Sequence, residues 1–71
     1  MKLARVIRPE GTWLITDPYS IVNTPPVGTI VQYKRVFSSG YDVYFPGILG
    51  YAPMDWGLFR EYFKDLDNET S

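Results

Sequence analysis

Several short segments of the chain alternate apolar and polar residues, which is the pattern of strands with one buried face. It is clearest over residues 41–45, where Tyr41, Val43 and Phe45 would point to the side opposite Asp42 and Tyr44. Residue types that favour strands also fill four further segments, residues 3–8, 12–16, 28–37 and 48–52. Turn formers follow most of these segments, at residues 9–11, 38–40 and 46–47. We therefore predict five antiparallel strands.

Two segments do not follow the strand pattern. Residues 17–28 are rich in turn formers, including Asn23-Thr24-Pro25-Pro26 and Gly28, and predict a long loop or an irregular hairpin. Near the end of the chain, apolar residues recur at the spacing of one helix face: Phe59, Tyr62, Phe63 and Leu66. Asp55, ahead of this stripe, is a suitable N-cap. A short C-terminal α-helix is expected, with residues 67–71 as a frayed acidic tail.

The composition indicates a small domain held together by side-chain packing. The chain has 71 residues with no Cys and no His, so disulfides and zinc sites of the usual Cys/His type are excluded. Six Tyr, four Phe and two Trp residues supply a large aromatic area for a core. The predicted fold class is mostly β: a small five-stranded antiparallel barrel with a short C-terminal α-helix. One domain would span residues 1–66.

The charge pattern bears on partners and location. The formal net charge is −1, which argues against general affinity for nucleic acid. Basic residues outnumber acidic ones over residues 1–36 and the reverse holds over residues 37–71, so the molecule could orient a charged partner. No segment is long and apolar enough to span a bilayer, and the N-terminus lacks the apolar stretch of a signal peptide. A cytoplasmic protein with no membrane partner is expected.

The second half of the chain resembles SH3 domains. Residues 47–56 read Gly-Ile-Leu-Gly-Tyr-Ala-Pro-Met-Asp-Trp, similar to the family's Gly-x-x-Gly turn and its apolar-Pro-x-Asn-Tyr segment. Residues 27–31, Val-Gly-Thr-Ile-Val, are similar to the family's Gly-polar-apolar-apolar strand start. The resemblance implies an SH3-like barrel.

The same resemblance implies ligand-facing roles for two residues. In SH3 domains the Pro and Tyr of that segment help line a groove for extended Pro-rich ligands, and Pro53 and Trp56 match these positions. The chain departs from the family at Gly40, which aligns with the family's ligand-facing Trp. It also has Leu-Ala-Arg-Val at residues 3–6, where the family has Ala-Leu-Tyr-Asp-Tyr. The resemblance therefore bears on the fold more than on the ligand.

The first expected strand carries a second resemblance. Residues 5–13 read Arg-Val-Ile-Arg-Pro-Glu-Gly-Thr-Trp, similar to the opening strand of a family of small SH3-like proteins that belong to photosystem I. That family helps to dock ferredoxin, an acidic protein, and Arg5 and Arg8 match its basic residues. The resemblance implies, as one alternative, a docking component of an electron-transfer complex.

The residue types argue against catalysis. His, the commonest general base, and Cys, the commonest thiol nucleophile, are both missing. Glu61 and Asp65 are four residues apart, but they fall on the polar face of the expected helix. Residues 46–50 lack the Lys-Ser/Thr ending of a phosphate-binding loop. We expect no enzymatic activity, no cofactor and no metal.

The lead hypothesis is a non-catalytic protein-binding module, either a small accessory subunit or an inhibitor of a host protein of the kind that viruses and mobile elements encode. Its expected contact residues are Tyr19, Tyr44, Pro53 and Trp56. The alternative is a single-stranded nucleic-acid-binding barrel that would use a basic patch of Arg5, Arg8, Lys34 and Arg35. Arg5 with Lys34, and Arg8 with Arg35, could pair across strands. The sequence leaves the oligomeric state open.

Overall fold

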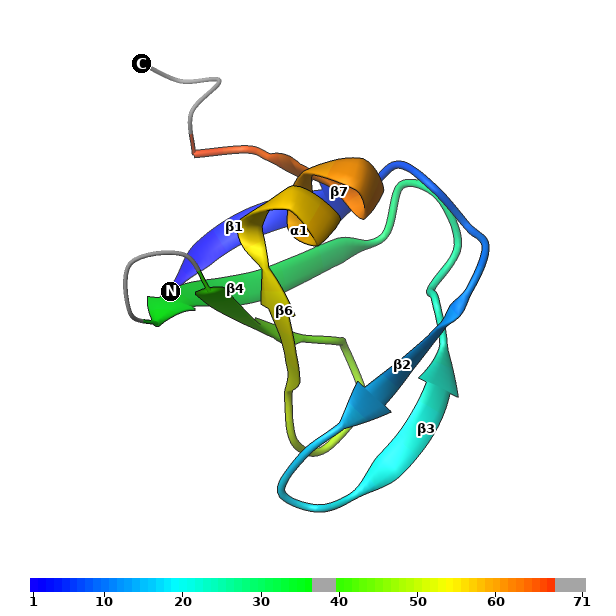
Figure 1. Cartoon of the computed structure of the whole chain (residues 1–71). Helices are drawn as coiled ribbons and strands as arrows, with labels where there is room; N and C mark the ends of the chain where they lie inside the picture. Colours follow the sequence, from blue (N-terminus) through cyan, green and yellow to red (C-terminus); the bar gives the residue numbers. More distant parts are fainter. Residues whose placement is uncertain (37–39, 68–71) are drawn as a thin grey trace.

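The main sheet curls into a half-barrel in the computed structural model, which describes residues 1–36 and 40–67 (Figure 1). Its antiparallel strands lie in the order β6-β5-β4-β1-β7. Their bounds are Lys2–Val6 (β1), Ile30–Val36 (β4), Gly40–Tyr44 (β5), Ala52–Asp55 (β6) and Phe63–Asp65 (β7). Strands β2 (Thr12–Ile15) and β3 (Ser20–Asn23) form a separate hairpin, and helix α1 covers Trp56–Tyr62. The mostly-β prediction, with a five-stranded antiparallel sheet and a short helix late in the chain, is confirmed.

One hydrophobic core lies inside the curl of the sheet. The predicted alternation holds along β4, where Val31 and Tyr33 are buried and Gln32 and Lys34 are exposed. Strand β2 contributes Trp13 and Ile15 from the hairpin in the same way. The buried set is Ala4, Val6, Trp13, Ile15, Val31, Tyr33, Val43, Phe45, Ala52, Met54, Phe59 and Phe63. Aromatic rings dominate this core, as the composition predicts.

Helix α1 packs on its own sheet. Its N-cap is Asp55, as predicted, and the cap carboxylate accepts a hydrogen bond from the Leu58 amide at 2.8 Å. The Phe59 ring is buried, with its centroid 4.8 Å from that of Tyr33 and 4.6 Å from that of Tyr41. The apolar stripe on the helix therefore helps to close the core of the domain.

The predicted length of this helix is wrong. It ends at Tyr62, and Phe63–Asp65 forms β7, which pairs with β1. The Ile7 amide donates to the Tyr62 carbonyl at 2.9 Å, and the Leu66 amide donates to the Leu3 carbonyl at 3.0 Å. Since β1 offers a second edge for pairing, this ladder replaces the last helical turn, and Leu66 lies beyond the helix.

Residues 17–28 contain strand β3, so the hairpin alternative is the correct one. Residues 17–19 form its turn, which includes a cis Asp17–Pro18 bond. The expected strand at residues 48–52 is wrong, because only Ala52 belongs to a strand. Gly50 bends the chain there with a φ of 90°, and the bend brings Tyr51 into a bridge with Thr16.

The predicted strand end and turn at residues 37–39 lie outside the described residues, as does most of the predicted tail. Of that tail, Asp67 is described, and its amide donates to the Asp65 carboxylate at 3.0 Å. In the described part of the chain, no helix has the length and apolar character needed to cross a membrane.

Candidate functional site

Trp56 stands at the surface, at the first turn of α1. About half of the residue, 51 %, is exposed. The Arg60 guanidinium lies over the indole ring, 4.3 Å from its centroid, one helical turn further along. Such a cation–π contact holds the indole and the guanidinium together, and the Asp55 cap fixes the turn that carries them. Local spacing alone thus places the two side chains together at the surface.

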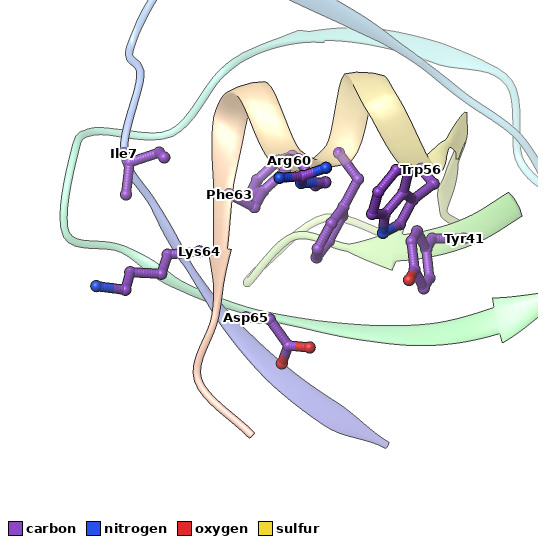
Figure 2. Close-up of a pocket in the computed structure, with 8 residues that line it drawn as sticks. Ile7, Tyr41, Trp56, Arg60, Phe63, Lys64 and Asp65 are labelled. Atoms are coloured by element: carbon purple, nitrogen blue, oxygen red, sulfur yellow. The ribbon is translucent and has the colours of Figure 1, made fainter. Parts of the chain in front are cut away.

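The Trp56–Arg60 pair borders a hollow of about 580 Å³ (Figure 2). The residues that line it are Ile7, Tyr41, Trp56, Phe59, Arg60, Phe63, Lys64 and Asp65. By strand alternation, Ile7 and Lys64 belong to the outer face of the sheet, whereas Phe63 and Asp65 belong to the inner face. Residues of both faces line one hollow only at the edge of a sheet, which here is the edge of β7. We call this site the edge hollow.

Asp65, the acidic residue that lines the edge hollow, already accepts hydrogen bonds within the protein. The Asp65 carboxylate accepts hydrogen bonds from the Tyr33 hydroxyl and from the Asp67 amide. Burial raises the pKa of the Tyr33 hydroxyl well above its usual value, and the Asp65 carboxylate adds to this rise, so Tyr33 remains a donor at neutral pH. Arg60, in contrast, makes no ion pair or hydrogen bond with the described residues. The guanidinium edge of Arg60 is therefore available to a carboxylate.

The four predicted contact residues do not line one hollow. Pro53 lines a second hollow of about 680 Å³ on β6, and Tyr41 borders both this hollow and the edge hollow. Pro53 and Trp56 therefore lie on adjoining hollows. Tyr44 lines a third hollow on the outer face of the sheet, and Tyr19, 73 % exposed, lies on the hairpin turn.

The predicted pairing of Arg5 with Lys34 is wrong. In the register of β1 with β4, Arg5 lies opposite Ile30, which is four positions from Lys34 along β4. Lys34 itself lies opposite Asp42 on β5. Arg5 instead lies opposite Lys64 on β7, a strand that the sequence analysis did not predict.

The predicted pairing of Arg8 with Arg35 is wrong as well. Arg8 follows the end of β1, where its guanidinium makes ion pairs with Glu10 at 3.3 Å and Glu61 at 3.4 Å. It also lies over the Tyr62 ring, 5.2 Å from the centroid. Arg35 lies within β4, opposite Tyr41. The four basic residues thus occupy separate places and do not line one groove.

Of the eight residues that line the edge hollow, seven were missed as site residues, since only Trp56 was expected to be one. Arg60 could have been found from the sequence, because it follows Trp56 by four positions on an expected helix. Tyr41 and Lys64 gave no local signal, since their positions depend on the pairing of β5 and β7.

Within residues 1–36 and 40–67, no three acidic side chains gather in a way that could hold a metal ion. Comparison of the chain with protein-family models, with curated proteins and with solved structures finds no match.

Proposed function

We propose that this chain is a non-catalytic protein-binding module and that Trp56, at the edge hollow, is its main contact residue. The observation that carries the proposal is a half-exposed indole stacked with a guanidinium that makes no ion pair with the described residues, beside a hollow with both apolar and charged residues in its lining. Trp and Arg are the residue types most enriched among the energetically dominant residues of protein interfaces. The proposal covers an accessory subunit as well as an inhibitor of a host protein.

The exposed part of Trp56 is large enough to matter for affinity. A Trp side chain presents roughly 250 Å². Covering its exposed half would remove about 120 Å² from water, worth about 3 kcal/mol. That free energy corresponds to about a hundredfold in Kd.

Trp56 can be changed without damage to the core. It is absent from the buried cluster, whereas Phe59 on the same helix is a member of it. The Asp55 cap acts through backbone and carboxylate atoms that a Trp56→Ala change leaves in place. Loss of binding in such a variant would therefore report on the surface and not on unfolding.

The test is the affinity of a partner identified by capture on the full chain. Trp56→Ala should weaken binding by about a hundredfold while circular dichroism and thermal stability stay unchanged. Tyr19→Ala, which removes another exposed aromatic ring outside the three hollows, is the matched control and should leave affinity within about threefold. A partner that binds Trp56→Ala as tightly as the native chain would overturn the proposal.

The scattered basic residues do not favour the nucleic-acid alternative, and Arg8 is occupied by two carboxylates. Titration with a labelled single-stranded oligonucleotide provides the check. Tight binding that falls steeply with added salt would favour a nucleic-acid partner over a protein.

A further inference from the structure

Strand β7 has one free edge among the described residues. It is the last strand in the order of the main sheet, with β1 on its only paired side. The hydrogen bonds on either side of the Arg5–Lys64 pair join Leu66 to Leu3 and Ile7 to Tyr62. Since hydrogen-bonded pairs alternate along an antiparallel ladder, the backbone groups of Lys64 point toward β1 and those of Asp65 point away from it.

Three backbone groups therefore face outward along this edge. They are the carbonyl of Phe63 and both the amide and the carbonyl of Asp65. The Phe63 amide is not among them, because it donates to the Phe59 carbonyl at the end of α1. This set of one donor and two acceptors is what an added strand needs for pairing.

Positive charge lies on both faces of the same edge. On the outer face, Arg5 and Lys64 are directly opposite each other on neighbouring strands. On the inner face, Arg60 borders the edge hollow and makes no ion pair with residues 1–36 or 40–67. The carboxylate of Asp65 is engaged by Tyr33 and by the Asp67 amide, so it offsets these charges only in part.

We propose that the free edge of β7 binds an extended segment of a partner protein by strand addition, and that two adjacent acidic residues of this segment contact Arg60 on one face and Lys64 with Arg5 on the other. Successive side chains of a strand point to opposite faces, so one acidic residue would reach each cationic group. A polypeptide is favoured over a nucleic acid because an extended polypeptide backbone presents its amide donors and carbonyl acceptors at the regular spacing of the outward groups. The inference rests on the proposed function of the edge hollow and specifies its partner.

Selection from a display library of random heptapeptides on the full chain tests the inference. The selected peptides should share two neighbouring Asp or Glu residues. Arg60→Gln should weaken their binding by about tenfold, the effect of losing one charge-assisted hydrogen bond. Lys34→Gln removes the same charge on the outer face of β4, away from the edge hollow, and should leave binding unchanged.

Hydrogen exchange then distinguishes strand addition from simple charge attraction. A bound peptide should slow the exchange of the Asp65 amide. The Ile21 amide, which by the same ladder argument points outward from the free edge of β3, is the internal control and should exchange at its original rate.

Failure of the inference and failure of the proposed function give different results. Peptides that lose affinity with Trp56→Ala but carry no acidic pair, or that leave the Asp65 amide unprotected, would overturn the strand-addition inference alone. Selected peptides that bind Trp56→Ala and the native chain equally would overturn the proposed role of Trp56, whereas the absence of any selected peptide would overturn the strand-addition inference.

Discussion

Thr24 is a buried polar side chain that ties the start of β2 to the end of β3. The indole N–H of Trp13 donates to the Thr24 hydroxyl oxygen at 2.8 Å. The hydroxyl in turn donates to the Glu10 carbonyl at 2.8 Å, with the Gly11 carbonyl at 3.1 Å. We predict that Thr24→Val, which keeps the shape of the side chain and removes its oxygen, will destabilise the protein by leaving the buried indole N–H without an acceptor.

The magnitude follows from the burial of each partner. An unsatisfied buried donor costs about 1–3 kcal/mol. The indole is 92 % buried, while the backbone carbonyls are only partly buried and can turn to water, so a loss of about 2 kcal/mol is expected. A domain of this length has a free energy of unfolding of about 4–10 kcal/mol. The loss should therefore lower Tm by about 8–16 °C.

Urea unfolding followed by circular dichroism measures this effect. Thr12→Val is the matched control, because Thr12 is exposed on β2 and its change should stay within about 0.5 kcal/mol. In a Trp13→Phe background, which has no indole N–H, the cost of Thr24→Val should shrink toward zero. Equal costs for Thr24→Val and Thr12→Val, or an unchanged cost in the Trp13→Phe background, would refute the reasoning.

Three further predictions concern the bend, the helix cap and alkaline stability. Gly50→Ala should cost about 3 kcal/mol, because its Cβ would lie 2.5 Å from the Thr16 carbonyl oxygen at a φ of +90°. Gly47→Ala, with a φ of +77° but no atom within 4 Å, should cost only about 1 kcal/mol; equal losses in chemical denaturation would contradict the steric argument. Asp55→Ala should cost about 1 kcal/mol through loss of the N-cap, and Asp55→Asn should restore most of it, as judged by thermal unfolding. The folded protein raises the pKa of Tyr33 above its unfolded value, so the stability contributed by its protonated form is present below about pH 10 and is lost as the pH rises further. Tyr33→Phe should therefore make unfolding free energy less dependent on pH above about pH 10, and an unchanged slope would argue against this origin.

Local patterns predicted the parts of the fold that local interactions decide. The alternation of Tyr41, Val43 and Phe45 places one face of β5 inward whatever its neighbours are. Asp55 caps α1 through a contact three residues away. The buried position of Phe59 also follows from its place on the apolar face of the helix.

Long-range pairing decided the parts that the sequence did not predict. Residues 63–65 continue a helical stripe, and only the open edge of β1 makes them a strand. The pairing of Arg5 with Lys34 was wrong for the same reason, since a cross-strand register depends on both partners and on the turns between them. Pro53 reads as a strand breaker, but β6 is an edge strand and tolerates it.

The candidate site also combines residues that local spacing brings together with residues that long-range strand pairing brings together. Trp56 and Arg60 form a pair through helical spacing, so this part of the lining of the edge hollow could have been predicted from the sequence. The sheet must form before β7 has a free edge with Tyr41 beside it. No local sequence pattern predicts these two features.

The position of β1 between β4 and β7 also affects how the chain folds. Its two neighbours are far apart in the sequence, because β4 ends at Val36 and β7 begins at Phe63. The sheet therefore cannot be completed until residues 63–65 are available. The β2–β3 and β4–β5 pairs are local and can form first, whereas docking β7 must close a long loop. Folding should therefore take on the order of milliseconds to seconds, and a growing chain would keep one edge of β1 uncovered until synthesis has passed residue 65.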